Sequence, residues 1–429
     1  MSKPQEKVTI HGLAAGGAGV GRMEDGMVAF VEGVYPGDTA LVRIDKAKKR
    51  HALATVVKLE TPSPMRRRPE CLHASDCGGC PWMGLKYDAQ LEWKKNIVSQ
   101  ALARIGKVES SARAVVPSPK TIGYRGRIRL KGVCSSKGFS FAFRRRSSNS
   151  LASVKSCSVA HPLINQVMEG LVEFLSSRLT LAAQVGEAVL ETDGQRCRLI
   201  IHPVGGINKN SVEGMVGAVE RLDAAIVIQG DQVGAQCGDP WLRVEEENQP
   251  GMWLAPGAFS QANLSLNPAL VEAVVRLSGL AEGDSGLDLY CGAGNYSIAL
   301  ASAGVAMTGV DRSWAAVDSA ERSRQANELI KAHFTREDCL ESASSLAESK
   351  IQFDSVIVNP PRGGAGEVFK KAMELARRRV VYVACDPATL SRDAALALEA
   401  GFVMGQAEVY DMFPHTPHME TVAAFERRS

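Results

Sequence analysis

One cysteine stands where a strand-forming segment ends. The segment VVYVACDPATLSRD, residues 380–393, runs from apolar residues into Cys385, and Asp386 and Pro387 follow at once. A cysteine at such a place is either a small apolar residue of a core or a nucleophile, because the thiolate form attacks electrophilic carbon. The other candidate site residues of the chain distinguish between these two interpretations.

A second group of cysteines has the spacing of metal ligands. The segment CLHASDCGGC places Cys71, Cys77 and Cys80 within ten residues, and its glycines keep the loop tight. Cys157 is the best candidate for a fourth ligand, since it belongs to the polar segment VKSCSVAHP. Zinc sites more often show two Cys-x-x-Cys pairs or added histidines, so this spacing favours an iron–sulfur centre. The competing interpretation is packed free cysteines, and a centre, if present, could be purely architectural.

The segment GLDLYCGAGNYSIALA reads as a strand, a glycine-rich turn and a helix, which is typical of a cofactor site. Gly292 and Gly294 let a ligand lie against the backbone. Asp311 ends the next strand about twenty residues later, where a carboxylate can bond ribose hydroxyls, and Asp338 follows the third strand. No third glycine completes a pyrophosphate fingerprint, so the pattern favours S-adenosylmethionine over a dinucleotide.

Two further segments belong to the same predicted sheet. Asn359-Pro-Pro-Arg362 follows the fourth strand, at the edge where doubly wound folds bind substrate. The segment YDMFPHTPHMETVAAFERR places His415, His418 and Glu420 before a final strand. For the two histidines we favour simple loop polarity. An acid between Met419 and an apolar strand is awkward unless it faces a site, so we expect Glu420 to face one.

The elements that must position these residues follow from the periodicity. From Gly286 onward, apolar strands alternate with alanine-rich helices, which predicts a doubly wound α/β domain. Residues from about 5 to 60 show short alternating runs between glycine-rich turns, which suits an OB-like barrel. A helical pattern covers residues 88–105, and strands with amphipathic segments fill residues 115–250.

The length of the chain limits the number of its domains, and the distribution of charge indicates the class of its partner. A chain of 429 residues is too long for one core, so several domains are expected. No apolar run approaches a membrane span and the N-terminus lacks a signal-peptide core, which predicts a cytoplasmic protein with no membrane partner. Residues 1–150 carry an excess of 15 positive charges and the remainder an excess of 12 negative ones. The basic residues cluster in KAKKR, MRRRP, YRGRIRLK and FRRR, which favours a polyanionic partner, above all nucleic acid.

Taken together, these motifs resemble the RNA 5-methyluridine (uracil-C5) methyltransferases over nearly the whole chain. The resemblance rests on GAFSQAN, DLYCGAGNYS, NPPRGG, CDPATLSRD and DMFPHTPHME in order, preceded by the cysteine segment. It implies a TRAM-like barrel at 1–60, a central α+β domain with a 4Fe–4S cluster at 61–250, and a catalytic S-adenosylmethionine-dependent domain at 251–429. Helix 88–105 is expected to pack with the catalytic domain, and the chain is expected to be a monomer.

The resemblance also implies roles for single residues. Cys385 aligns with the family's nucleophile and Glu420 with its base. The cluster ligands carry over onto Cys71, Cys77, Cys80 and Cys157. The cofactor contacts carry over onto Gln261, Tyr290, Asn295, Asp311, Asp338 and Asn359.

The chain departs from the family pattern at two positions. Asn359 stands where an aspartate is usual, which adds a hydrogen-bond donor. Asp386 stands where an asparagine is common, and its carboxylate would tend to raise the pKa of the neighbouring Cys385 thiol. A helix that starts after Asp386-Pro387 would act in the opposite direction and help to hold the thiolate.

The RNA target and the rival functions stay open from sequence. A barrel combined with cluster cysteines favours 23S ribosomal RNA over transfer RNA within the family. An amino-group methyltransferase is a rival because of Asn359-Pro-Pro, although Arg362 replaces the aromatic residue that such enzymes carry. A non-catalytic RNA-binding protein is a second rival. A redox protein is a third, although no flavin or nicotinamide motif accompanies the cysteines.

Overall fold

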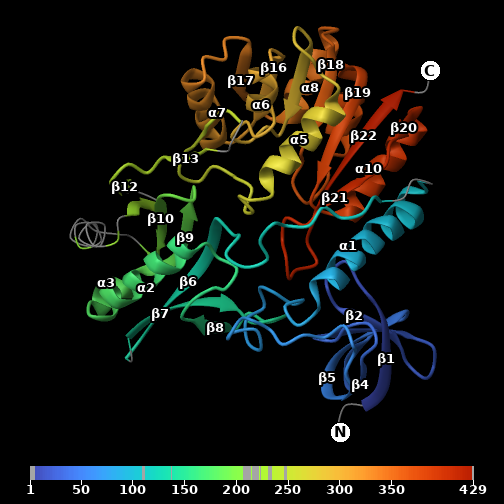
Figure 1. Ribbon diagram of the computed structural model, residues 1–429, viewed down its shortest axis with the longest axis vertical. Helices are drawn as coiled ribbons and strands as arrows, with labels where there is room; N and C mark the ends of the chain where they lie inside the picture. Colours follow the sequence, from blue (N-terminus) through green and yellow to red (C-terminus); the bar gives the residue numbers. More distant parts are fainter. Residues whose placement is uncertain are drawn as a thin grey trace.

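The computed structural model describes residues 5–108, 112–136, 138–205, 214, 222, 224–229, 234–245 and 249–427. Figure 1 shows a small barrel, a central sheet beside it, and a larger sheet with helices on both sides. Within these ranges no helix is long and apolar enough to cross a membrane.

The N-terminal barrel has the predicted closed form. Its strands follow the order β1-β2-β3-β5-β4. Buried Val8, Ile10, Val31 and Val42 alternate with exposed neighbours and fill the interior. The strand bounds are β1 (Gln5–Leu13), β2 (Gly19–Arg22), β3 (Val28–Glu32), β4 (Thr39–Ala47) and β5 (His51–Thr61).

A long helix follows the cysteine loop and packs against the C-terminal part of the chain. Helix α1 (Tyr87–Ala101) continues into a π-helical turn, η1 (Leu102–Gly106), and both pack against α10 (Pro387–Glu399), the helix that follows Cys385. The helix expected at 88–105 is thus present as α1 and η1, and it contacts a helix of the C-terminal part.

The central part is a sheet with the order β12-β11-β10-β9-β6-β7-β8. Helix α2 (Pro162–Ser176) buries Ile164, Met168 and Leu171 against it, at the spacing of one helix face. The remaining bounds are β6 (Arg127–Ser135), β7 (Gly138–Arg144), β8 (Leu151–Val154), α3 (Leu179–Ala182), β9 (Val185–Thr192), β10 (Cys197–Pro203), β11 (Ala224–Gln229) and β12 (Gly234–Cys237). A hairpin of β13 (Leu242–Val244) and β14 (Met252–Leu254) leads out of it.

The C-terminal part confirms the doubly wound prediction. Its sheet has the order β17-β16-β15-β18-β19-β22-β20, in which the strands from β15 to β19 run parallel and β22 runs antiparallel. The strands are β15 (Ser285–Leu289), β16 (Ala306–Asp311), β17 (Ala332–Arg336), β18 (Phe353–Val358), β19 (Ala376–Ala384), β20 (Phe402–Met404), β21 (Glu408–Tyr410) and β22 (Glu420–Arg427). The helices besides α10 are α5 (Asn267–Ser278), α6 (Ser297–Ser302), α7 (Trp314–Ala326), α8 (Cys339–Glu348) and α9 (Glu367–Leu375).

This topology gathers the predicted residues at one edge. Tyr290, Asp311, Asn359 and Cys385 each stand at or just after the carboxyl end of a parallel strand. Parallel strands present these ends on one side of a sheet, so the residues converge although 95 positions separate the first from the last.

Candidate active site

The carboxyl edge of the large sheet opens into a cavity of about 610 Å³. Its lining includes most of the residues that the sequence singled out: Gln261, Tyr290, Asp311, Asp338, Asn359, Cys385 and Glu420. It also includes Arg125, Phe259, Arg362, Phe413 and His418.

Cys385 and Glu420 are brought together by strand pairing. Strands β19 and β22 are antiparallel, and Ala384 of β19 lies opposite Thr421 of β22. The next residue along β19 is Cys385, and the residue before Thr421 is Glu420. A thiol and a carboxyl group therefore meet at one point of the cavity wall.

The thiol of Cys385 is protonated at neutral pH in this environment. Burial is the largest cause that raises its pKa to about 11, the Glu420 and Asp386 carboxylates raise it further, and Arg362 lowers it. Helix α10 begins at Pro387, as expected, and the pKa of Cys385 is nevertheless raised, in the direction expected of Asp386. The Asp386 carboxylate caps this helix by accepting hydrogen bonds from Ala388 N (2.8 Å) and Thr389 N (3.1 Å).

The carboxyl group of Glu420 titrates near neutral pH. Complete burial raises its pKa to about 8, and the charge of Arg362 acts against this rise. A carboxyl group with a pKa close to the working pH can both release and accept a proton, which suits an acid–base role. Arg362 is thus a charged group that faces both Cys385 and Glu420.

Asp393 holds the loop that carries Arg362. Its buried Oδ2 accepts hydrogen bonds from Ala365 N at 2.9 Å, from Gly366 N at 3.3 Å and from Tyr382 Oη at 2.6 Å. Asp393 belongs to α10 and Tyr382 to β19, so the loop is tied to the two elements that flank Cys385. We infer that Asp393 positions Arg362 relative to the thiol and the carboxyl group.

The glycine-rich turn leaves room for a ligand on the opposite side of the cavity. Tyr290 (φ 64°) and Gly292 (φ 57°) are both left-handed, which is a strained conformation for tyrosine. Asp311 fixes the turn by accepting hydrogen bonds from Gly292 N (3.1 Å) and Ser313 N (2.8 Å). A Cβ atom at Gly292 would meet nothing within 4 Å, so open space lies against the backbone there.

Polar groups around this space fit a nucleoside-like ligand such as S-adenosylmethionine. Asp338 caps α8 by accepting a hydrogen bond from Leu340 N at 2.9 Å and still reaches the cavity. Gln261 Oε1 is buried and has no hydrogen-bond partner within the described ranges, as a group that awaits a ligand would. Asp311 supplies a carboxylate at the end of the second strand, where the sequence predicted the ribose contact.

Asn295 is the predicted cofactor residue that does not line the large cavity. Its side chain forms two hydrogen bonds with that of Asn267, at 2.9 and 3.1 Å. It lines a small neighbouring cavity together with Gln261 and Tyr290 rather than the large one. Its contact with a cofactor stays a prediction.

His415, unlike His418, differs from the loop polarity that we favoured for both histidines. His415 is buried and bonded to Gln90: its backbone N donates to Gln90 Oε1 (2.8 Å) and its Nδ1 lies 3.1 Å from Gln90 Nε2. Burial lowers the pKa of His415 to about 4, so the ring is neutral. His418 is exposed at the mouth of the large cavity.

Arg125 and Phe413 also belong to the site, although sequence alone did not single them out. The Arg125 guanidinium lies 5.7 Å from the Phe413 ring centroid, and both line the large cavity. In the sequence, Arg125 belongs to a basic segment and Phe413 to the segment DMFPHTPHME, but neither residue stood out within its segment. A ring next to a guanidinium is a surface on which a base can stack.

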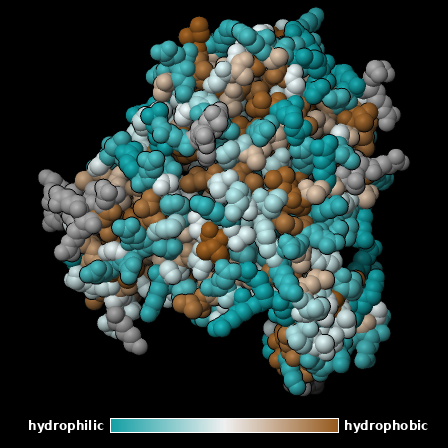
Figure 2. All heavy atoms as spheres, in the orientation of Figure 1, coloured by the Kyte–Doolittle hydropathy of each residue, from teal (hydrophilic) through white to brown (hydrophobic). Residues whose placement is uncertain are grey.

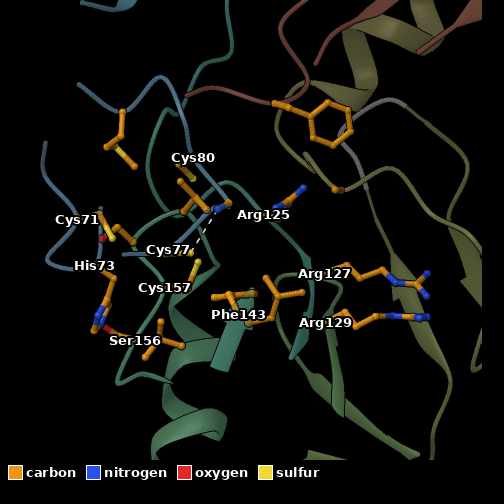
Figure 3. A pocket seen from close by; sticks show the side chains of 18 of the residues that line it. Cys71, His73, Cys77, Cys80, Arg125, Arg127, Arg129, Phe143, Ser156 and Cys157 are labelled. Carbon is orange, nitrogen blue, oxygen red and sulfur yellow. Dashed lines mark hydrogen bonds between the residues drawn. The ribbon is translucent and has the colours of Figure 1, made fainter. Parts of the chain in front are cut away.

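A second cavity, of about 530 Å³, gathers the predicted cluster ligands. Figure 3 shows Cys71, Cys77, Cys80 and Cys157 around it, with Arg127 and Arg129 extended away. Burial is the main cause that raises the pKa of Cys77, of Cys80 (to about 12) and of Cys157. Thiolates in this cavity need a compensating positive charge. The metal ions of a bound centre would supply it.

The side-chain geometry itself does not define a metal site. Within the described ranges, no group of three or more histidine, cysteine, aspartate or glutamate side chains is arranged to hold a metal ion. The four thiols nevertheless line one cavity.

Comparison with known proteins agrees with this geometry. The family described as tRNA (Uracil-5-)-methyltransferase matches residues 242–428, and the TRAM domain matches residues 5–57. The chain is 32% identical to the 23S rRNA (uracil(1939)-C(5))-methyltransferase RlmD of Thiobacillus denitrificans, with 98% of this chain and 99% of that protein covered. The chain belongs to the RNA uracil-C5 methyltransferase family.

Two further matches are consistent with this family. The RlmD protein of Photorhabdus laumondii is 30% identical, over 98% of this chain and 96% of that protein. The crystal structure of Pyrococcus abyssi tRNA (uracil-54, C5)-methyltransferase in complex with S-adenosyl-L-homocysteine superposes with a TM-score of 0.75 at 26% identity. It covers 98% of this chain and 100% of that one.

The Arg362 charge is expected to set the pH dependence of methyl transfer. The value of kcat/KM should rise with pH from 6 to 10, because Cys385 ionises only at higher pH, and the slope of its logarithm should decrease at a midpoint near 8, above which Glu420 is ionised and can accept a proton. Since Arg362 lowers the pKa of both Glu420 and Cys385, Arg362→Met should move this midpoint to higher pH, whereas Arg362→Lys should move it less. Rates measured from pH 6 to 10 check this, and an unchanged midpoint in Arg362→Met would contradict it.

The Asp393 contacts give a second prediction. Asp393→Asn places an amide among three donors, which should lower the free energy of unfolding by about 1–3 kcal/mol. It should also shift the pH midpoint upward, as Arg362→Met does, because the loop that holds Arg362 loosens. Tyr382→Phe removes one donor only and is the matched control with a smaller shift. A variant that loses stability but keeps the midpoint would show that Asp393 is merely structural.

Proposed function

We propose that the chain transfers a methyl group from S-adenosylmethionine to carbon 5 of a uridine in 23S ribosomal RNA. The observation that carries this proposal is the meeting of Cys385 and Glu420 at the pairing of β19 and β22, inside a cavity with a nucleoside-compatible turn. An amino-group methyltransferase has no use for this thiol and carboxyl pair, and a non-catalytic RNA-binding protein would not need it.

The chemistry follows from the weak nucleophilicity of uracil carbon 5. Cys385 and Glu420 first release their protons to solvent. The Cys385 thiolate then adds to carbon 6, and the ring takes up the electron pair of its carbon 5–carbon 6 double bond as an enolate. Carbon 5 then attacks the methyl group of S-adenosylmethionine, and the methyl–sulfur bond breaks with its electrons on sulfur. Glu420 removes the proton from carbon 5, the bond between carbon 6 and sulfur breaks, and Cys385 leaves as thiolate.

The raised pKa values fit this order of events. In the free enzyme both groups hold their protons, which protects the thiol until substrate arrives. S-adenosylmethionine supplies an electrophilic methyl group on a cationic sulfur. A cation near the two groups lowers the pKa of each, in the same direction as Arg362.

The cofactor is held, in this proposal, by Gln261, Tyr290, Asp311 and Asp338, with Asn295 behind them and Asn359 toward the substrate. Asn359 lines the cavity next to Cys385 and can both donate and accept. It therefore suits the edge of a uracil ring, which carries both an N–H group and carbonyl oxygens.

The choice of RNA rests on the relatives. Proteins named as 23S rRNA methyltransferases match the chain over nearly their full length. The archaeal tRNA enzyme shares the fold at a lower identity, so transfer RNA is the second candidate. A target buried in a structured RNA has to leave its stack to reach the cavity, and the Arg125–Phe413 surface could receive a neighbouring base.

The mechanism predicts that Glu420→Gln accumulates a covalent adduct with RNA and that Cys385→Ala forms none. Glu420→Gln should form a methylated covalent adduct with RNA that survives denaturing electrophoresis, because elimination needs the proton to leave carbon 5. Cys385→Ala should form no adduct and no 5-methyluridine. Unmodified 23S rRNA and tRNA are the two substrates, with mass spectrometry of the nucleosides as readout. Adduct formation on tRNA alone would replace the ribosomal target, and full methylation by Cys385→Ala would refute the mechanism.

We further propose a division into residues 1–60, 61–250 and 251–429, with a 4Fe–4S cluster bound by Cys71, Cys77, Cys80 and Cys157. The gathering of four thiols in one partly apolar cavity supports the cluster. Its iron ions would supply the positive charge that buried thiolates require. No step of methyl transfer passes through it.

Anaerobic reconstitution with iron and sulfide tests the cluster. The wild-type chain should bind about four iron atoms and absorb in the visible range, and Cys77→Ser or Cys157→Ser should lose most of both. Cys134→Ser is the control, since Cys134 is exposed and outside this cavity. Retained iron in both cavity variants, or stoichiometric zinc in the wild type, would contradict the assignment.

A further inference from the structure

A third cavity, of about 410 Å³, lies where four segments meet. The barrel contributes residues 16–18 and 32–33, and the cysteine loop contributes residues 78, 79 and 81. The end of β7 and the turn after it contribute residues 143–147, and the loop before β22 contributes residues 416–418. We call this cavity the interdomain groove. The methyl-transfer chemistry described above makes no use of it.

The interdomain groove adjoins the active site. His418 lines both the groove and the large cavity that contains Cys385. The two cavities therefore meet at His418. A strand that leaves the large cavity past His418 enters the groove.

Ion pairing decides which of the basic clusters can meet a polyanion. In the segment Tyr124–Lys131, Arg127 binds Glu191 at 3.0 Å, Arg129 binds Glu187 at 3.0 Å and Lys131 binds Glu187 at 2.8 Å. These pairs reduce the positive potential of that segment, and Arg127 and Arg129 extend away from the cysteine cavity (Figure 3).

The arginines of the groove are different. Arg144 donates to the neutral amide oxygen of Asn149 at 2.6 Å. Within the described ranges Arg146 makes no ion pair, while Arg145 between them is paired with Asp76 at 2.6 Å. Glu32 is the acid in the lining, and it accepts a hydrogen bond from Ser147. The groove thus keeps an excess of positive charge.

Glycines let a ligand approach the backbone of the groove. Gly16, Gly17, Gly33, Gly78 and Gly79 all line it. A Cβ atom at Gly33 would stand 3.1 Å from the Arg146 guanidinium, and one at Gly78 would stand 2.9 Å from Arg146 N. Side chains at these positions would crowd Arg146, so the glycines keep its guanidinium accessible.

These features favour recognition by charge rather than by apolar contact. On the face shown in Figure 2, hydrophobic residues form separate patches between hydrophilic ones. A sugar–phosphate backbone carries one negative charge per nucleotide and binds to unpaired arginines.

We propose that the interdomain groove holds the RNA strand next to the target uridine, with its phosphates on Arg144 and Arg146. This proposal rests on the proposed function, because it takes RNA as the substrate. It adds a path for the strand: the uridine enters the cavity past His418, and the adjoining phosphates lie between the barrel and the turn after β7.

Binding measurements with Arg146→Ala and Arg144→Ala test the path. Each variant should raise the KM for RNA by about tenfold, with a smaller change in kcat and no change in the affinity for S-adenosylmethionine. The slope of log K against log salt should fall by about 0.7 for each lost phosphate contact. Arg146→Lys should restore the slope, which separates lost charge from a folding defect. Arg129→Ala is the matched control, because its charge is already paired with Glu187.

Shortened substrates sharpen the test. Two shortened RNAs should differ, one that begins at the target uridine and one that ends at it. The RNA that lacks the strand held by the groove should be methylated equally by the wild type and Arg146→Ala. Unchanged slopes in both arginine variants, or an equal loss in Arg129→Ala, would overturn the groove assignment. So would an Arg146→Ala defect that persists with both shortened RNAs. A wild-type chain that methylates no uridine would instead overturn the proposed function.

Discussion

The antiparallel pairing of β22 with β19 is the interaction on which the site depends. The parallel strands alone bring one residue each to the carboxyl edge, and they supply the cofactor turn and Cys385. Only a strand that runs the opposite way can begin at that edge. Because β22 begins there, its first residue, Glu420, stands beside the residue that follows the end of β19. The proposed nucleophile and the proposed base thus lie on two adjacent strands that run in opposite directions.

This pairing requires the segment before β22 to be held in place. Asp411 forms a fully buried ion pair with Lys94 of α1, and the side chain of Gln90 on the same helix bonds His415. Removal of either partner of a buried ion pair leaves an uncompensated charge, so this contact fixes the geometry of the loop. Trp82 N donates to His415 O at 2.9 Å, which ties the cysteine loop to the same segment. Helix α1 and the cysteine loop therefore support the catalytic edge, although neither belongs to the large sheet.

The sequence was sufficient where a property is local or follows from strand order. Glycine turns, strand-end acids and the position of Cys385 depend on the alternation of strands and helices, so the sheet edge could be predicted. The pKa of Cys385 could not, because it depends on burial and on Glu420, which lies 35 residues further on. His415 was misread for the same reason: its partner Gln90 is 325 positions away.

The arginines show most clearly what the sequence alone could not predict. The basic first third of the chain indicated a polyanionic partner, but it did not show which arginines are available. Arg129 and Arg146 look alike in sequence, and a distant acid, Glu187, distinguishes them by pairing with the first. Net charge draws RNA toward this part of the molecule, whereas the unpaired arginines fix where its phosphates come to rest. The placement of the uridine therefore depends on the positions of acidic residues as much as on those of the arginines.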